Sequence, residues 1–317
     1  MHQPYGLTDL QTRRSDYDIR IQDCPNATVW PVDEFKIPKP GIAGISGRDG
    51  MPIREAGLER GGGVLLSCPQ GADHTSVEFR DQEVILGGYI AHHYGHFLLE
   101  SLARLWGYRD SSLPVVWAAG RQFTDWELSL FDLLGVARNR LIALRQPVRF
   151  ARIHVPTPGF IIRRNFHERQ RDALAVTPCA PGKARVYLSR SSFKSRLFTA
   201  SGESAVEDIL AGRGWQIIRP ETLPISEQVA ILANAAVVAG IEGSAFHTLM
   251  LCAKPQARVI VLRRQNTNAN YDTIASTIGL DQRDMRGWVV NDPADDRFAT
   301  LRHPAKCAAR IIELAAS

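Results

Sequence analysis

The 317-residue sequence predicts an α/β protein made of two doubly wound domains. In the second half, short apolar runs typical of buried strands alternate with helical segments of about ten residues, which indicates a mostly parallel sheet covered on both faces. In the first half a similar but less regular alternation is present. The chain is also too long for one ordinary hydrophobic core and suits two domains of normal size. We expect these domains to cover residues 1–170 and 171–317.

The second half is the more regular of the two. The expected strands cover residues 184–190, 215–218, 235–239 and 258–262, and the expected helices cover residues 203–212, 225–234 and 244–252. Ser226 is a suitable N-cap for the second of these helices. Residues 273–278 suggest a further short helix, and an amphipathic helix over 304–316 closes the chain. In two-domain doubly wound proteins such a closing helix often crosses back to the first domain.

The third expected strand of this half, with the turn and helix that follow it, has the features of an anion site. Gly240 and Gly243 bracket the turn and let the backbone approach a ligand closely. The first N–H groups of a helix have no partner inside the helix, so they attract a group such as phosphate. Ligands of doubly wound sheets bind at the carboxyl ends of the strands, and Arg190, Glu221 and residues 242–244 are expected at that edge.

The first half begins with a poorly periodic region, residues 1–63, which we expect to be irregular with short strands. Five strands are expected after it, over residues 61–67, 76–79, 83–90, 114–118 and 148–155. A helix is expected over 125–134, with Thr124 as its cap. Residues 157–183 contain several prolines and a run of arginines, and we expect them to hold the linker between the domains.

Residues 91–106 predict a helix with an apolar face and an ordered polar face. The apolar face is formed by Leu98, Leu99, Leu102, Leu105 and Trp106. On a helical wheel His96, Glu100 and Arg104 lie on the opposite side. This polar side is either a solvated surface with an ion pair between Glu100 and Arg104 or the acid/base face of an active site, in which a histidine lies one turn from a carboxylate. A metal site formed by His92, His96 and Glu100 is a weaker alternative, since the spacing is not that of a known zinc motif.

Composition and charge exclude several classes of protein. With 44% hydrophobic and 22% charged residues the chain is an ordinary globular protein, and the net charge of +5 is too modest to suggest a nucleic-acid partner. The five cysteines are scattered, which argues against a disulfide framework and a structural zinc site. The first residues lack the pattern of a signal peptide, and no apolar stretch is long enough to span a membrane. We expect a cytoplasmic protein, for which peripheral contact with a membrane surface remains open.

Three stretches taken together resemble glycosyltransferase family 61. The first is Tyr94-Gly-His96-Phe-Leu-Leu-Glu100 followed by Arg104. The second is Tyr187-Leu-Ser189-Arg190, followed by Arg196 and Glu203. The third starts at Pro220-Glu221, continues through Glu227-Gln228 and leads into Gly240-Ile-Glu242-Gly243-Ser244. Their order and spacing, rather than any one of them, carry the resemblance.

The resemblance implies a GT-B-like fold, in which two Rossmann-like domains face each other across a cleft. It also implies an inverting mechanism, a nucleotide-sugar donor bound by the second domain, and no obligatory metal or other cofactor. We expect the donor to be a UDP-sugar and the acceptor to be a glycan or a lipid-linked glycan. Many family members are bacterial capsule-type proteins, so a surface-polysaccharide pathway is the expected context.

The sequence departs from the family pattern at three places. Many members have His where Glu242 stands, Asn where His93 stands, and Asn-Glu where Ala200-Ser201 stand. The first departure bears on the donor. A carboxylate beside a diphosphate repels it unless the carboxylate binds the ribose or sugar hydroxyls or is protonated.

These residues lead to a hypothesis for the reaction. Arg190 and Arg196, with the amides of Gly243 and Ser244, would hold the donor diphosphate and stabilise it as it leaves. Glu100, oriented by His96, would take the proton of the acceptor hydroxyl.

Two further residues have alternative roles. His247 would reach the sugar or a phosphate, or else pack in the core. Glu221 would hold the ribose, or else stabilise its loop.

Other functions remain as alternatives. A non-catalytic sugar- or nucleotide-binding protein of the same fold would keep the binding groups but lack the base. A nicotinamide-dependent oxidoreductase is permitted by the strand and helix pattern, but no G-x-G-x-x-G follows the first strand of either half. A hydrolase is disfavoured because no G-x-S-x-G turn is present and Ser244 is better placed as a helix cap.

Overall fold

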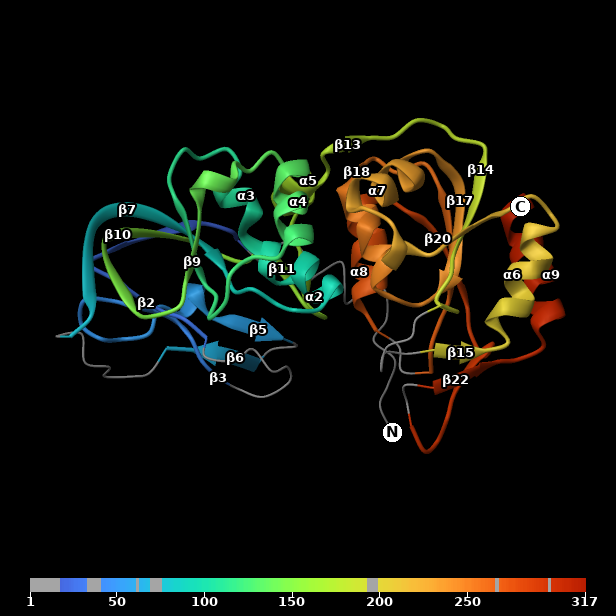
Figure 1. Ribbon diagram of the computed structural model, residues 1–317, viewed down its shortest axis with the longest axis horizontal. Helices are drawn as coiled ribbons and strands as arrows, with labels where there is room; N and C mark the ends of the chain where they lie inside the picture. The colour runs from blue at the N-terminus through green and yellow to red at the C-terminus, as the bar shows by residue number, and fades with distance from the viewer. Residues whose placement is uncertain are drawn as a thin grey trace. The chain divides into compact units, whose positions relative to one another are not determined.

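The computed structural model describes residues 18–32, 41–60, 63–68, 76–192, 199–265, 268–295 and 298–317 (Figure 1). The chain divides into two compact units, which we name unit 1 (Met1–Leu174) and unit 2 (Ala175–Ser317). Each unit contains both helices and strands, so the fold is mixed α/β.

The segment expected to be a linker, residues 157–183, is largely folded structure. Strands β11 (Phe160–Ile161) and β12 (Asn165–Phe166) form a hairpin, and helix α5 (Glu168–Leu174) follows it. Both lie in unit 1, and α5 contacts helix α3 (Leu105–Tyr108) of the same unit. The prolines of this segment had suggested a linker, but proline is equally suited to the ends of short strands and helices.

Unit 2 contains a five-stranded sheet in which every neighbouring pair of strands is parallel. The strand order is β16-β14-β17-β19-β20, with bounds Gln216–Ile218, Ala184–Leu188, Ala235–Ile241, Arg258–Leu262 and Asp281–Met285. One face carries helices α6 (Glu203–Ala211) and α9 (Pro304–Ala316); the other carries α7 (Ile225–Ala233), α8 (Asn270–Ile278) and the 3-10 helix η5 (Ser244–Leu251) (Figure 1). The parallel sheet predicted for the second half is confirmed.

Three of the strands that the sequence predicted, β14, β17 and β19, lie inside this sheet, and the fourth, β16, is a partly exposed edge strand. Strand β17 reads Ala-Ala-Val-Val-Ala-Gly-Ile, and six of its seven residues are buried. The fifth strand, β20, was not predicted. Its sequence Asp-Gln-Arg-Asp-Met is polar and mostly exposed, because it is an edge strand with only β19 as a neighbour in the sheet. An edge strand does not need the apolar run that marks a central one.

Three details of unit 2 correct the expectations from sequence. The helix after β17 is a 3-10 helix and not an α-helix. The N-cap of α7 is Pro224, and Ser226 lies inside the first turn. The closing helix α9 packs against α6 and β19 within unit 2, where its apolar face joins the core. The remaining short elements of the unit are η4 (Pro220–Thr222), the pair β13 (Thr177–Pro178) and β18 (Cys252–Ala253), and the sheet of β15 (Thr199–Ser201), β22 (Phe298–Leu301) and β21 (Val289–Asn291).

Unit 1 is built on a mixed sheet of seven strands. The order β4-β2-β10-β7-β8-β9 combines Gly44–Ser46, Thr28–Trp30, Val148–Pro156, Glu78–Gly88, Val115–Ala118 and Leu141–Leu144, and β1 (Ile21–Pro25) also pairs with β10. Strands β10, β7, β8 and β9 are parallel to one another, whereas β1, β2 and β4 are antiparallel to their neighbours. This mixed sheet differs from the doubly wound parallel sheet expected for the first half.

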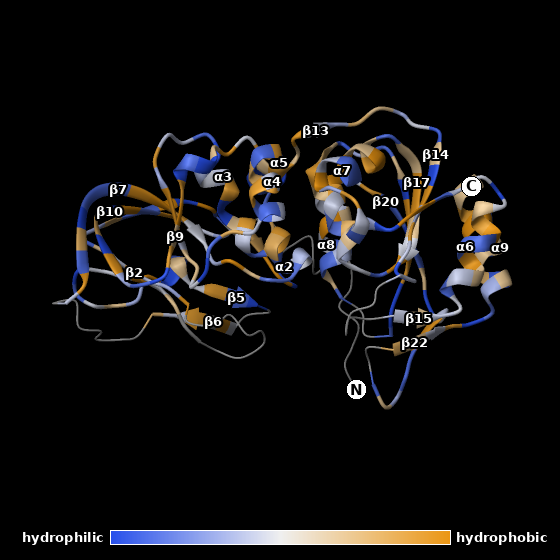
Figure 2. Ribbon diagram, in the orientation of Figure 1, coloured by the Kyte–Doolittle hydropathy of each residue, from blue (hydrophilic) through white to orange (hydrophobic). Residues whose placement is uncertain are grey.

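Strand β7 is one continuous strand where the sequence suggested two. Its first half is exposed and its second half is buried, so it is hydrophilic at the start and hydrophobic at the end (Figure 2). The exposed residues interrupt the apolar pattern without interrupting the strand. Helix α4 (Asp125–Leu133) follows the prediction more closely, and Thr124 forms the expected cap, in a capping box with Glu127.

The helix expected over 91–106 is broken into three pieces. They are α2 (Tyr94–Leu99), the 3-10 helix η2 (Ser101–Arg104) and α3. Glu100 lies at the first break. A separate small sheet, β3-β6-β5, consists of Gly41–Ile42, Gly63–Ser67 and Leu58–Arg60 and ends in Arg60, and the 3-10 helices η1 (Arg54–Ala56) and η3 (Arg138–Arg140) complete the unit.

No helix among the described residues is both long enough and apolar enough to cross a membrane.

Candidate functional site

The strand order of unit 2 places one particular pair of strand ends at the sheet's switch point. From β14 the chain moves to β16 on one side and then to β17 on the other, so the direction of winding reverses between β14 and β17. In open α/β sheets ligands bind outside the carboxyl ends of the strands at this point. Arg190 follows β14, and Glu242, Gly243 and Ser244 follow β17. The structure therefore brings these four predicted donor-site residues to one edge.

Arg190 and Gly243 are in close contact at this edge. A Cβ atom added to Gly243 would clash with Nη1 of Arg190, so the glycine leaves room for the guanidinium group. The φ angle of Gly243 is −171°, which any residue adopts, and space is therefore the reason for a glycine here. Burial lowers the pKa of Arg190, and the nearby carboxylate of Glu203 opposes this shift. The result is a half-buried cation above the turn.

Two buried glutamates on α6 form hydrogen bonds with residues at the carboxyl end of β14 and just after it. Glu203 Oε1 accepts hydrogen bonds from the backbone N–H of Arg190 at 3.2 Å and from the hydroxyl of Tyr187 at 3.3 Å. Glu207 Oε1 accepts from the hydroxyl of Ser189 at 2.7 Å. Burial raises the pKa of Glu203 from 4.5 to about 7, and the neighbouring Glu207 adds to the shift. These bonds hold the backbone from which Arg190 projects.

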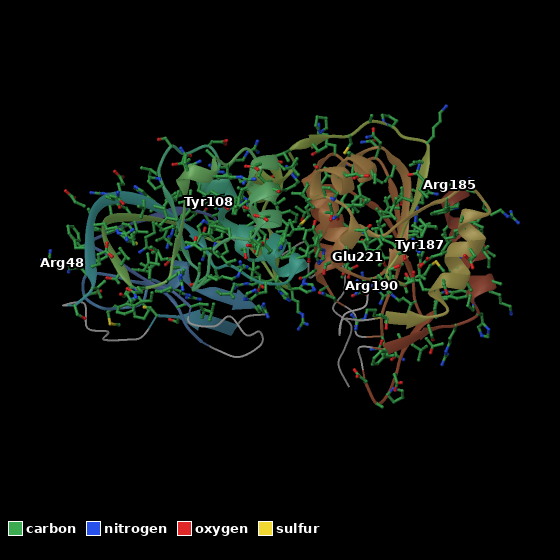
Figure 3. The ribbon with its side chains drawn as sticks, in the orientation of Figure 1. Arg48, Tyr108, Arg185, Tyr187, Arg190 and Glu221 are labelled. Atoms are coloured by element: carbon green, nitrogen blue, oxygen red, sulfur yellow. The ribbon has the colours of Figure 1, made fainter. Side chains whose placement is uncertain are left out.

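Glu221 lies at the same end of the sheet as Arg190 (Figure 3). It belongs to η4, directly after β16, and its side chain is exposed. Its carboxylate acts on Arg190 through space and raises the pKa of that guanidinium, against the larger effect of burial. Arg219, two residues earlier, donates to Glu207 at 3.1 Å and so joins the support of β14.

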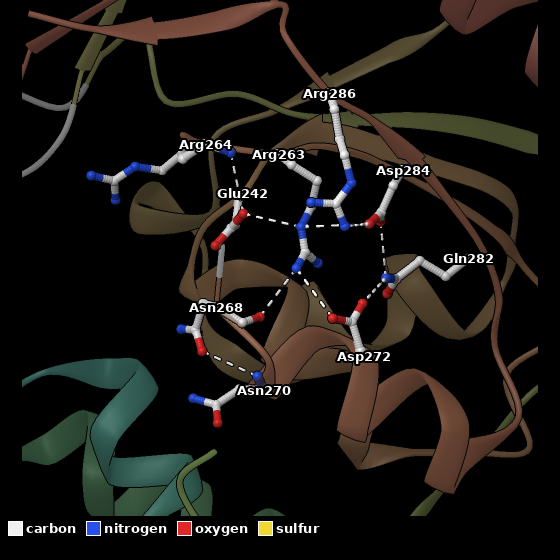
Figure 4. A network of polar contacts seen from close by, with 9 residues as sticks. All are labelled: Glu242, Arg263, Arg264, Asn268, Asn270, Asp272, Gln282, Asp284 and Arg286. Atoms are coloured by element: carbon white, nitrogen blue, oxygen red, sulfur yellow. Dashed lines mark hydrogen bonds and ion pairs between the residues drawn. The ribbon is translucent and has the colours of Figure 1, made fainter. Parts of the chain in front are cut away.

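Glu242 is buried in a network of charged groups (Figure 4). Its Oε2 accepts a hydrogen bond from the backbone N–H of Arg264 at 3.2 Å and lies 3.3 Å from Nε of Arg263. Arg263 is almost fully buried and is also within 3.4 Å of Asp272 and 3.6 Å of Asp284. Burial raises the pKa of Glu242, and the charge of Arg263 opposes the rise.

The other predicted donor-site residues have different surroundings. His247 is buried in η5, and its ring lies 5.1 Å from that of Tyr271, so it is packed in the core of unit 2. Ser244 is the first residue of η5 and not its cap, which is Gly243. Among the described residues, no carbonyl group accepts a hydrogen bond from the backbone N–H of Gly243 or Ser244. Arg196 lies outside the described residues.

In unit 1, Glu100 is the centre of a second charged cluster. It is 4% exposed, and its two oxygens accept from Nε and Nη2 of Arg60 at 2.5 and 2.6 Å. Nδ1 of His96 lies 2.7 Å from Oε2 of the same carboxylate. Burial is the largest influence on Glu100 and raises its pKa, but the bonds from His96 and Arg60 together lower the pKa below its ordinary value. Glu100 is therefore a stable carboxylate.

The same distances assign the hydrogen on His96. Nδ1 also lies 3.2 Å from Nη2 of Arg60, but a guanidinium can only donate. The shorter contact is to a carboxylate, which can only accept, so Nδ1 carries the hydrogen and donates to Glu100. In the neutral ring the second nitrogen, Nε2, is then an acceptor, and the side chain is 31% exposed. His96 is thus able to receive a proton from a group that approaches it.

The ion pair that had been considered for the expected polar face does not describe this cluster. Arg104 is 1% exposed, and its guanidinium donates to the backbone oxygens of Pro156, Glu55 and Gly57. Glu100 is also buried, so this face is not a solvated surface. Within the described ranges, no group of three or more His, Cys, Asp or Glu side chains is placed to hold a metal ion, and His92 is exposed.

Two arginines of these clusters were missed from sequence. Arg60 is distant in sequence from Glu100, and no local pattern marks it. Arg263 could have been found, because it directly follows the apolar strand β19, and the rule that indicated Arg190 applies to it equally. The glutamates of α6 could have been found only in part, since a spacing of four residues places them on one face without showing which way it points.

The parallel sheet and its switch point place unit 2 in the class of doubly wound α/β proteins. The sequence model of the family described as Glycosyltransferase 61 matches residues 94–260, which is more than half of the chain. The protein therefore belongs to glycosyltransferase family 61, and this membership supports glycosyltransferase activity. No curated protein matches the chain. The matched segment runs from the first residue of α2 into β19, and it contains Glu100, Arg190 and Glu242 but neither Arg60 nor Arg263.

Proposed function

We propose that this glycosyltransferase moves a sugar from a UDP-sugar to a hydroxyl of a glycan or lipid-linked glycan, with inversion at the anomeric carbon. The contact of Arg190 with Gly243 at the switch point of unit 2 is the observation that carries the proposal. Unit 2 would bind the donor and unit 1 would activate the acceptor, in a GT-B-like organisation. We place the reaction in the cytoplasm, in bacterial surface-polysaccharide or capsule synthesis, with peripheral contact to the membrane surface where the acceptor is lipid-linked.

The donor diphosphate would bind at the turn after β17. Arg190 supplies a half-buried positive charge there, and the N–H groups of Gly243 and Ser244 supply donors of fixed direction. Arg196, which was predicted to act with Arg190, belongs to the same proposal. Together these groups would stabilise the charge that develops on the leaving diphosphate, so the proposal needs no metal ion. Glu221 stays a proposed ligand of the ribose, and His247 would support the site through Tyr271.

The acceptor hydroxyl would lose its proton to His96 and not to Glu100. Both oxygens of Glu100 already accept hydrogen bonds from Arg60 and His96, and its lowered pKa makes it a weak base. Its proposed role is to hold the ring and to stabilise the imidazolium that forms. In the step itself, the acceptor oxygen bonds to the anomeric carbon, the bond to the diphosphate breaks with its electron pair, and the proton passes to Nε2 of His96.

Calorimetric titration of the purified protein with UDP, GDP, CMP and NAD tests the donor part. We expect UDP to bind, and we expect Arg190→Ala to weaken it about 10- to 150-fold, the effect of one lost charge-assisted bond. Gly243→Ala should weaken UDP as well, because the new methyl group displaces the guanidinium. Arg185→Ala is the matched control, since this arginine lies on the same strand β14 but at its other end (Figure 3).

Each outcome of this titration has a meaning. Unchanged UDP affinity in Arg190→Ala would remove the proposed diphosphate site. Binding of NAD in place of nucleoside diphosphates would favour the oxidoreductase. Tight binding of UDP-sugars with no turnover by hydrolysis or transfer would favour a non-catalytic binding protein.

The base is tested by the rate at which UDP is released from UDP-sugars. We expect His96→Ala to lower the maximal rate about 10²- to 10⁴-fold while the affinity for UDP stays that of the wild type. His93→Ala is the control, because His93 is the exposed neighbour whose ring lies 5.5 Å from that of His96. An equal loss in both variants would contradict the assignment of His96 as the base.

A further inference from the structure

Glu242 occupies an unusual position for a buried carboxylate. It directly follows β17 and precedes Gly243, the residue that contacts the guanidinium of Arg190, at the strand ends where the donor is proposed to bind. Its backbone N–H donates to the carbonyl of Leu262 at 3.0 Å, which ties it to the neighbouring strand β19. The residue is 5% exposed. The position of this carboxylate is therefore set by the sheet itself and not by a flexible loop.

Only one of its two oxygens takes part in the charged network. Oε2 faces Arg263 and the N–H of Arg264, whereas Oε1 makes no hydrogen bond with any described residue and points away from the network (Figure 4). A carboxylate oxygen can only accept a hydrogen bond. Oε1 is thus an acceptor, held in a fixed direction, to which no described residue donates.

The charge of Arg263 does not explain why a third carboxylate is present. Asp272 and Asp284 also lie near its guanidinium, and its Nη2 donates to the carbonyl of Asn268 at 3.2 Å (Figure 4). Asp284 is shared with Arg286, whose Nη2 lies 2.9 Å from it, but Asp272 lies 3.4 Å from Arg263 and is enough to balance that one guanidinium. The network instead holds Glu242 in place, so that its second oxygen is available to a ligand.

We propose that Oε1 of Glu242 accepts a hydrogen bond from a hydroxyl group of the bound donor and so determines which donors this enzyme accepts. The inference rests on the proposed function. A phosphate oxygen would be repelled at this position, and a neutral hydroxyl is the partner that a carboxylate selects beside an anion site. The hydroxyl belongs either to the ribose or to the transferred sugar, and the experiment separates the two sources.

The test compares the affinities of UDP, 2′-deoxy-UDP and UDP-glucose for the wild type, Glu242→Ala and Glu242→Gln. For a ribose contact, the wild type binds 2′-deoxy-UDP about 10- to 150-fold more weakly than UDP, and Glu242→Ala removes this difference. For a sugar contact, Glu242→Ala binds UDP as the wild type does but loses a similar factor for UDP-glucose. The affinities of Glu242→Gln should lie between those of the wild type and Glu242→Ala, because the amide keeps one acceptor oxygen but not the charge.

Asp284→Asn is the matched control. It removes another carboxylate of the same network but leaves Oε1 of Glu242 unchanged. We expect it to preserve the ratios among the three ligands. Glu242→Ala leaves Asp272 and Asp284 to balance Arg263, and circular dichroism will show that it is folded. Should it fail to fold, Glu242→Gln and the wild-type preference for UDP over its deoxy analogue carry the test.

Three results would overturn the inference, and they can be distinguished from one another. Wild-type ratios in both Glu242 variants, with UDP still bound, would reject the hydroxyl contact and leave the proposed donor site intact. An equal change of these affinity ratios in Glu242→Ala and Asp284→Asn would show that both substitutions act only through the fold of the network. Absence of UDP and UDP-glucose binding to the wild type would reject the proposed donor site together with this contact.

Discussion

Glu100 in unit 1 and Glu242 in unit 2 are two buried glutamates with arginine partners, yet the pKa values of their carboxyl groups shift in opposite directions. Their exposed fractions are nearly equal, 4% and 5%. Burial is the largest influence on both, and by itself it raises the pKa of a carboxyl group. Depth in the protein therefore does not distinguish them, and the difference must come from the partners.

The geometry of the partners accounts for the difference. Glu100 receives two short hydrogen bonds from Arg60 and a third from His96, and these outweigh burial. Glu242 has one oxygen engaged, at 3.2 and 3.3 Å, and its arginine is shared with Asp272 and Asp284. The number and length of hydrogen bonds, and not the mere presence of an arginine, thus decide whether a buried glutamate is a stable carboxylate.

Arg263 and Arg60 differ in how many carboxyl groups lose their cation when the arginine is removed. Arg263→Met should cost about 3–5 kcal/mol of unfolding free energy, because it leaves three carboxyl groups without their shared buried cation. Arg60→Met should cost about 2 kcal/mol, since His96 still donates to Glu100. Urea unfolding measures both. The control is Arg286→Met, an arginine of the same network whose side chain is 56% exposed, and an equal loss there would contradict the argument.

Glu203 extends the comparison to a glutamate whose carboxyl group accepts, among the described residues, from a tyrosine hydroxyl and a backbone N–H and from no guanidinium. Its pKa is raised from 4.5 to about 7, so the folded state holds a proton that the unfolded state has lost between these values. Stability therefore falls as the pH rises from about 4.5 to 7. Glu203→Gln removes this penalty and should stabilise the protein by roughly 3 kcal/mol at pH 8 but hardly at pH 4. A gain in Glu203→Gln that is equally large at pH 4 and pH 8 would contradict the assignment.

Glu100 and Glu242 should also respond to acid in opposite ways. A lowered folded pKa gives stability that is present above the ordinary value of 4.5 and is lost as the pH falls through the folded value. Glu100→Gln should therefore cost about 1–3 kcal/mol at pH 7, and the cost should shrink below pH 4.5. For Glu242→Gln, where the pKa is raised, the wild type's advantage should instead shrink as the pH rises. Urea midpoints between pH 3 and 7 that change in parallel would refute the comparison.

Sequence periodicity identified the parts of the fold that are buried on both sides. Strands β14, β17 and β19 were predicted because parallel central strands need continuous apolar runs. Strand β20 and residues 80–82 of β7 escaped prediction because an edge or exposed strand tolerates polar residues. The helix over 91–106 was predicted as one element, since local spacing does not show where tertiary contacts break a helix.

For the candidate sites, the sequence likewise predicted some contacts between residues but not the chemistry of those residues. The spacing of His96 and Glu100 predicted that they would touch, and the carboxyl-end rule predicted that Arg190 and the turn of Gly243 would share an edge. Their chemical roles were not predictable. We moved the proposed base from Glu100 to His96 because Arg60, at the end of β5 in the small sheet β3-β6-β5, occupies the carboxylate of Glu100.

By itself, the sequence determined the family of this protein, the parallel sheet of its second half and the residues that meet through regular spacing. These features depend on interactions among neighbours along a strand or helix, which a pattern records directly. Only the tertiary structure decided the partners of the buried charges. The pairs Arg60 with Glu100 and Arg263 with Glu242 join separate segments of the chain, and a charge gains its strength from the low-dielectric surroundings that folding creates.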